Sequence, residues 1–195
     1  MTQIVIYHSV LGVRKGIQDA AEIFRHAGHE VTVVDQYEGR TFDDYTEASA
    51  FAENIGYPTL MEEAISAVET LADGFIAAGF SNGGGMAEYV ATRRKTRGVL
   101  MFSGALPLSM IGISEWPHGV PAQIHYTVDD PFRLQEGVDA VAASVRAAGA
   151  SVELFDYPGQ GHLFTDKSLP KEYDANSAEI LWQRALGFCA SPLTD

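Results

Sequence analysis

The chain is poor in positive charge and contains a single cysteine. Its 195 residues include 13 Lys and Arg against 26 Asp and Glu, which gives a formal net charge of -13. Nucleic-acid binding needs clustered cations that neutralise phosphates, so we expect no nucleic-acid partner. The single cysteine, Cys189, excludes an internal disulfide, and a reducing, cytoplasmic compartment is the simplest expectation.

Long apolar stretches are also missing. No run approaches the roughly 20 residues that a membrane-spanning helix needs, so we expect no membrane partner. The first residues, MTQIVIYHSV, lack the charged start of a signal peptide. The composition, 46% hydrophobic and 20% charged, is that of an ordinary globular protein, and the length fits one domain over residues 1–195.

Short apolar segments alternate with helical patterns along the chain. Six segments rich in β-branched and aromatic residues predict strands: 3–8, 30–35, 74–80, 97–103, 121–128 and 151–157. Five segments predict helices: 13–28, 59–73, 82–95, 134–149 and 176–190. Apolar strands that alternate with helices indicate an α/β fold, with a parallel sheet covered by helices on both faces.

In such a sheet, ligands bind beyond the carboxyl ends of the strands. Reactive side chains that follow a predicted strand are therefore candidate site residues: Ser9, Ser81, Asp129, Asp130 and His162. They lie far apart in the sequence, but the loops that carry them share one edge of the predicted sheet.

Ser81 lies in the stretch GFSNG, which matches the nucleophile elbow G-x-S-x-G. The motif falls between an apolar strand and a helix, so it predicts an exposed serine at the tip of a sharp turn. Gly79 and Gly83 have no Cβ atom, which lets the strand and helix pack closely. The free backbone N–H groups at the start of the helix suit a developing oxyanion. A phosphate-binding loop would need a different glycine spacing or a following lysine, and neither is present.

A serine hydroxyl needs a base to become a good nucleophile. Among six histidines, His162 follows the last predicted strand, which gives the chain order serine, acid, histidine that accompanies this elbow. The acid is Asp129 or Asp130 in VDDPF, and adjacent side chains point in different directions, so only one can face the imidazole. No compact cluster of His, Cys and carboxylates indicates a metal site.

The motifs GFSNGG, DDPF and GHLF, in this order, resemble those of the dienelactone hydrolase family of α/β-hydrolases. The stretch AGHEVTVVDQYEGRTF (27–42) is also similar, and the resemblance covers most of the chain. It implies a compact α/β-hydrolase fold, with a mostly parallel central sheet of about six strands and helices on both faces.

The same resemblance implies the residues of the site. The triad would be Ser81, Asp130 and His162, with Asp130 matching the aspartate before Pro-Phe. The oxyanion hole would be formed by the backbone N–H groups of Asn82 and Val10. No cofactor is implied.

The chain departs from the founding members of that family at three positions. They have a cysteine in place of Ser81, a glutamate in place of Ser9, and an arginine where Asp166 stands here. That arginine holds a substrate carboxylate. We therefore expect a serine hydrolase that cleaves a small, uncharged ester, thioester or lactone through an acyl-enzyme.

The pocket walls are expected to come from two long connections, 37–58 and 105–121, and from residues beside the motifs. Ser9, Tyr37, Trp116 and Phe164 are the side chains chosen for the pocket, with Phe42, Tyr57, Met110 and Ile111 as further candidates. Core packing is the alternative for each of them. A non-catalytic module that binds a small molecule on the same fold is the alternative function, and a homodimer is left open.

Overall fold

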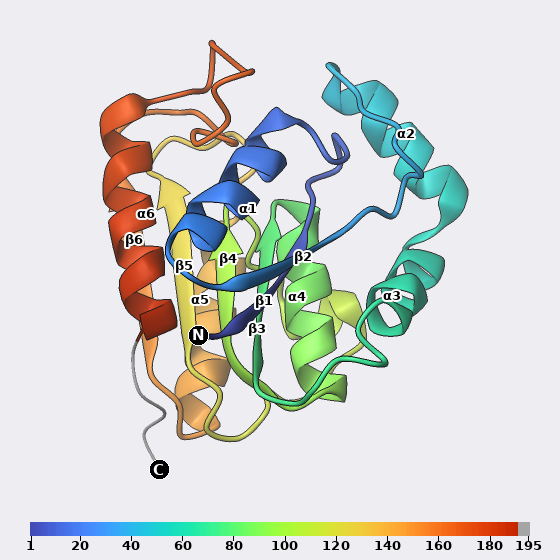
Figure 1. The fold of residues 1–195 in the computed structure, drawn as a ribbon, viewed down its shortest axis with the longest axis vertical. Helices are drawn as coiled ribbons and strands as arrows, with labels where there is room; N and C mark the ends of the chain where they lie inside the picture. Colours follow the sequence, from blue (N-terminus) through green and yellow to red (C-terminus); the bar gives the residue numbers. More distant parts are fainter. Residues whose placement is uncertain (191–195) are drawn as a thin grey trace.

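Six parallel strands form one sheet at the centre of the molecule (Figure 1). The computed structural model describes residues 1–190, so the last five residues of the expected domain lie outside the described residues. The sheet order is β2-β1-β3-β4-β5-β6. The strands are β1 (Gln3–Tyr7), β2 (Glu30–Val34), β3 (Phe75–Phe80), β4 (Thr96–Phe102), β5 (Ala122–Thr127) and β6 (Val152–Tyr157).

Helices follow most of the strands. The α-helices are α1 (Lys15–His26), α2 (Tyr45–Ile55), α3 (Tyr57–Ser66), α4 (Asn82–Arg93), α5 (Gln135–Ala147) and α6 (Ala175–Ala190). A short 3-10 helix, η1 (Leu108–Ile111), follows β4. Within residues 1–190, none of these helices combines the length and apolar character that crossing a membrane requires.

The direction in which the chain winds places helices on both faces of the sheet. Crossovers between parallel strands are right-handed. The chain runs one way from β1 to β2 and the other way from β3 to β6, so α1 lies on the opposite face from α4 and α5. Helix α6 shares the face of α1, because the rings of Trp182 and Phe24 pack edge to face 5.8 Å apart (Figure 1). The predicted α/β-hydrolase fold is thereby confirmed.

Burial differs between the centre and the edges of the sheet. Strands β3 and β5 are buried along their whole length, and β1 and β4 are buried except at one position each. The edge strands β2 and β6 are partly exposed. The carboxyl ends of the buried central strands lie at the top of Figure 1, and α2 lies beside this edge.

The six predicted strands and four of the five predicted helices are present with small shifts at their ends. The helix predicted over 59–73 is shorter than expected: α3 begins at Tyr57 and ends at Ser66, and turns follow it. Helix α2 is a difference from the prediction, since the sequence indicates one long connection over residues 37–58. Asp44 caps this helix by accepting a hydrogen bond from the Glu47 N–H at 2.9 Å, and Gly56 ends it with φ of 93°.

Candidate active site

Ser81 occupies the turn between β3 and α4 in a strained conformation. Its φ of 53° and ψ of -124° lie outside the regions that a non-glycine residue ordinarily adopts. A Cβ atom at Gly79 would overlap the backbone of Gly83, so only glycine permits this close approach of strand and helix. The turn thus holds the hydroxyl of Ser81 out beyond the end of the sheet.

His162 lies in the loop after β6 and contacts Ser81. Its Nε2 is 2.7 Å from Ser81 Oγ, and the residue is only 4% exposed. The loop is fixed by two hydroxyl groups from the ends of neighbouring strands. Ser103 Oγ donates to the carbonyl of His162 at 2.7 Å, and Thr127 Oγ1 donates to that of Gly161 at 2.9 Å. The imidazole is therefore positioned by the sheet.

Asp130 contacts the other nitrogen of the His162 ring. Its two carboxylate oxygens lie 3.0 Å and 2.8 Å from His162 Nδ1. Oδ1 also accepts a hydrogen bond from the Phe132 N–H at 2.8 Å, which fixes the carboxylate. Asp129 is exposed. Of the two aspartates that the sequence left open, the structure places Asp130 against the imidazole.

Asn82 and Val10, whose backbone N–H groups are the expected oxyanion hole, line the same pocket as Ser81. Asn82 is the first residue of α4, so its N–H has no acceptor within the helix. Three hydrogen bonds hold the turn that carries Val10. The Leu11 N–H donates to Ser9 Oγ at 3.2 Å, the Gly12 N–H donates to the Ser9 carbonyl at 3.0 Å, and the Phe42 N–H donates to the Leu11 carbonyl at 3.0 Å.

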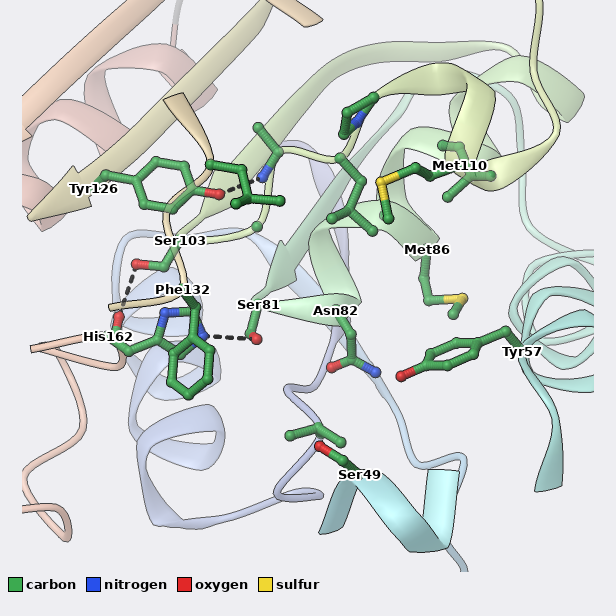
Figure 2. A pocket seen from close by; sticks show the side chains of 18 of the residues that line it. Ser49, Tyr57, Ser81, Asn82, Met86, Ser103, Met110, Tyr126, Phe132 and His162 are labelled. Carbon is green, nitrogen blue, oxygen red and sulfur yellow. Dashed lines mark hydrogen bonds between the residues drawn. The ribbon is translucent and has the colours of Figure 1, made fainter. Parts of the chain in front are cut away.

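Ser81 and His162 lie at a pocket of about 400 Å³, shown in Figure 2. Among residues 1–190, the lining includes no Asp, Glu, Lys or Arg. The larger side chains that line it are Tyr45, Tyr57, Met61, Met86, Leu106, Pro107, Met110, Ile111, Tyr126, Phe132 and Leu134. This size and apolar character suit a small, uncharged molecule.

Three of the side chains suggested by the sequence, Tyr57, Met110 and Ile111, line this pocket. The four side chains that were the first choice for the pocket do not line it. The suggested side chains that lie elsewhere are Ser9, Tyr37, Phe42, Trp116 and Phe164.

The large side chains Tyr37, Trp116 and Phe164 are buried in the core. Tyr37 packs among neighbouring aromatic rings and is 2% exposed. Trp116 donates from its indole Nε1 to the Val120 carbonyl at 2.8 Å, and Phe164 packs on Tyr157 with ring centroids 5.1 Å apart. Large apolar side chains gain more free energy from full burial than from lining an open pocket, and sequence pattern alone does not separate the two fates.

Asp166 also lies outside the pocket. It is 5% exposed, and its Oδ1 accepts hydrogen bonds from the N–H and Oγ of Ser168 at 2.8 Å and 2.6 Å. Its Oδ2 is 3.6 Å from Arg14 Nε. The carboxylate is therefore paired with Arg14 and Ser168 outside the pocket.

Two aromatic side chains that the sequence did not single out flank His162. The ring centroids of Phe132 and Tyr45 lie 4.7 Å and 5.9 Å from that of His162. The Tyr45 hydroxyl donates to Glu172 at 3.0 Å, and Glu172 in turn accepts from the Leu163 N–H at 2.7 Å. Burial and the Glu172 carboxylate raise the pKa of Tyr45, so its hydroxyl remains a donor. This chain ties α2 to the histidine loop.

Other buried histidines have structural partners. His8 Nε2 accepts a hydrogen bond from the Gln36 N–H at 3.1 Å, and burial lowers the pKa of His8. His125 is 2.8 Å from the Tyr157 hydroxyl, and burial lowers the pKa of His125 to about 3. Burial thus disfavours the charged form of both imidazoles, and neither lines the pocket.

Comparison with known proteins identifies the family. The model of the dienelactone hydrolase family matches residues 1–192. A search of curated protein sequences finds no significant match.

Solved structures of low sequence identity share the fold. A dienelactone hydrolase-like promiscuous phosphotriesterase from metagenomic libraries is 19% identical with a TM-score of 0.80, over 96% of this chain and 85% of that one. A dienelactone hydrolase from Anabaena variabilis is 17% identical with a TM-score of 0.66, over 99% of this chain and 88% of that one. An esterase from Thermogutta terrifontis, phosphonylated by sarin, is 17% identical with a TM-score of 0.64, over 96% and 81%. On the family match, the chain belongs to the dienelactone hydrolase family and is a carboxylic ester hydrolase.

Proposed function

We propose that the protein hydrolyses small, uncharged esters, thioesters or lactones through a triad of Ser81, His162 and Asp130. The observation that carries this proposal is the unbroken chain of hydrogen bonds from Ser81 Oγ through His162 to Asp130 at an uncharged pocket. The strained turn at Ser81 and the free N–H at the start of α4 support it.

Acylation begins when Ser81 Oγ attacks the carbonyl carbon of the substrate. His162 Nε2 takes the serine proton, and the Asp130 carboxylate stabilises the imidazolium through Nδ1. The N–H groups of Asn82 and Val10 donate hydrogen bonds to the oxyanion of the tetrahedral intermediate. Its collapse breaks the bond to the alcohol oxygen, which receives the proton from His162. The alcohol leaves, and the acyl group stays on Ser81.

Deacylation follows the same route with water as the nucleophile. His162 Nε2 takes a proton from the water, and the hydroxide oxygen bonds to the acyl carbon. When the bond to Ser81 Oγ breaks, His162 returns the proton to the serine. The net reaction adds one water to the ester and releases an acid and an alcohol, and no cofactor takes part.

The test is hydrolysis of 4-nitrophenyl acetate and butyrate by the wild-type protein and by Ser81→Ala. We expect kcat/KM to fall by about 10³-fold or more in the variant, since the residual rate would come from binding and the oxyanion hole alone. Ser151→Ala, which changes an exposed serine, is the control and should retain wild-type activity. Equal activity of wild type and Ser81→Ala would overturn the proposal.

A further inference from the structure

The two sides of the pocket differ in chemistry. Three of the five methionines in the chain line it, and each comes from a different element: Met61 from α3, Met86 from α4 and Met110 from η1. Figure 2 shows Met86 and Met110, together with Tyr57, on the side of Ser81 that is away from His162.

On the opposite side, two aromatic rings pack against His162. Phe132 lies beside His162 in Figure 2, and the two ring centroids are 4.7 Å apart. Tyr45 contacts the same imidazole from α2. The methionine side and the aromatic side, so defined, are therefore separated by Ser81.

The proposed reaction assigns a direction to each part of an ester. The alcohol oxygen must lie near His162 Nε2, because that nitrogen protonates it. The carbonyl oxygen must face the N–H groups of Asn82 and Val10. The carbon chain of the acyl group takes the remaining direction, away from His162.

We infer that the methionine side is the acyl-binding subsite and that the aromatic side receives the departing alcohol. The inference rests on the proposed function and extends it to a substrate class: esters of apolar, flexible acyl groups. Methionine side chains are unbranched and adaptable, so they fit acyl groups of different shapes. The absence of charged side chains from the described lining agrees with an apolar acyl group.

The methionine side extends from the interior of the protein to its surface. Met86 is 2% exposed and Met110 is 64% exposed, so the subsite runs from the interior to the surface. An octanoyl chain bound to Ser81 extends farther along this side than an acetyl group does, so it can contact more of its apolar surface. Because burial of each methylene is favourable, the longer chain should be preferred.

The experiment compares, for each variant, the ratio of kcat/KM between two substrates. A loss of Ser81 or His162 reactivity that affects both substrates equally leaves this ratio unchanged. The acyl ratio is that of 4-nitrophenyl octanoate to 4-nitrophenyl acetate. The alcohol ratio is that of 2-naphthylmethyl butyrate to ethyl butyrate, since both alcohols are poor leaving groups that need protonation by His162. The variants are Met110→Ala and Phe132→Ala, with Val128→Ala as a matched control that is 52% exposed and outside the pocket. Met110 and Phe132 are themselves 64% and 53% exposed, so their truncation leaves the core intact.

We expect Met110→Ala to lower the acyl ratio by about threefold or more and to leave the alcohol ratio unchanged. Phe132→Ala should lower the alcohol ratio by a similar factor and leave the acyl ratio unchanged. Val128→Ala should change neither ratio. Equal effects of Met110→Ala and Phe132→Ala on both ratios, or the reverse pairing, would overturn the inference.

Failure of the proposed function would look different. In that case Ser81→Ala would hydrolyse the acetate as fast as the wild-type protein does. If Ser81→Ala is inactive and the ratios do not separate, the triad stands and only the assignment of the two sides is wrong.

Discussion

Asp129 and Asp130 are neighbours in the sequence but have different environments. The two residues are adjacent, yet Asp130 is 6% exposed and bonded to His162 Nδ1, whereas Asp129 is exposed. The β5 strand ends just before them, so one side chain faces the histidine loop and the other faces solvent. Sequence reasoning identified the pair but could not choose between its members without a resemblance, because the choice depends on the direction of the backbone after the strand.

The first prediction compares Asp130→Asn with Asp129→Asn. An asparagine at position 130 keeps the shape of the side chain but favours the wrong tautomer of His162, so we expect kcat to fall by about 10³- to 10⁴-fold. Asp129→Asn should stay within about twofold of wild type, since surface substitutions away from the site have small effects. Steady-state hydrolysis of 4-nitrophenyl butyrate measures both. A larger loss in Asp129→Asn would transfer the role of the acid to Asp129.

At the scale of elements, helix α4 does more than present Ser81. Glu88 on this helix is fully buried, and its Oε1 accepts a hydrogen bond from the Leu106 N–H at 2.8 Å. Leu106 belongs to the loop after β4 that forms part of the pocket wall. Burial raises the pKa of the Glu88 carboxyl well above its usual range. The helix thus holds a protonatable group under the wall of the pocket.

The second prediction uses the sign of that pKa shift. The folded protein binds the Glu88 proton more tightly than the unfolded chain does, where the pKa is about 4.3. Stability therefore falls as the pH rises above the unfolded-state pKa toward the folded-state pKa. Glu88→Gln keeps an acceptor for the Leu106 N–H and has no proton to lose. We expect its Tm, measured relative to wild type by thermal unfolding, to rise between pH 5 and pH 8.

A matched variant separates this effect from the titration of other carboxylates. Glu62 on α3 is exposed, so the Tm of Glu62→Gln relative to wild type should not change with pH in the same way. A difference between Glu88→Gln and wild type that stays constant from pH 5 to pH 8, or that falls, would contradict the assignment.

Helix α2 is the α-helix that the sequence did not predict. The strands and most helices follow from apolar periodicity, because the core selects that pattern. The α2 segment lies beside the pocket and buries only Ala48 and Ala52, so its apolar pattern is weak. Its start is nevertheless readable: Asp44 followed by Glu47 matches a helix N-cap with an acidic residue three positions later. The missed helix carries Tyr45, one of the two rings against His162.

At the scale of the whole molecule, the negative net charge and the uncharged lining of the pocket both disfavour anionic substrates. The net charge of -13 weakly opposes the approach of anions, and salt screens this effect. The pocket, as far as its described lining shows, has no cation to pair with a buried carboxylate, and an unpaired buried charge is costly. The sequence suggested the same preference from Asp166, but that residue is paired with Arg14 outside the pocket, so the reason is different.

The third prediction concerns substrate charge. The test substrates are the 4-nitrophenyl esters of glutaric acid and of its monomethyl ester, which differ in one carboxylate. We expect kcat/KM to be at least about tenfold higher for the methyl ester, since the free carboxylate loses its hydration without gaining a partner. The preference should persist at high salt, because it arises inside the pocket. A preference for the free acid would contradict it and would indicate that an arginine from another loop reaches the substrate.

The convergence of the site residues could be predicted from the sequence. Parallel strands bring loops that are distant in the chain together at one edge of the sheet. Ser81, Asp130 and His162 each follow a strand, so their convergence follows from topology. The pocket walls depend instead on how α2, α3 and η1 pack over that edge. Those contacts join elements far apart in the chain, which local pattern does not describe.

The most direct test of the central proposal is the site and rate of reaction with a fluorophosphonate, which labels only an activated serine quickly. We expect one adduct per chain, mapped by mass spectrometry to the peptide that contains Ser81. Labelling should be absent in Ser81→Ala and about 10³-fold slower or more in His162→Ala, because the serine then lacks its base. No rapid labelling of the wild-type protein, or an adduct on a residue other than Ser81, would contradict the proposed triad.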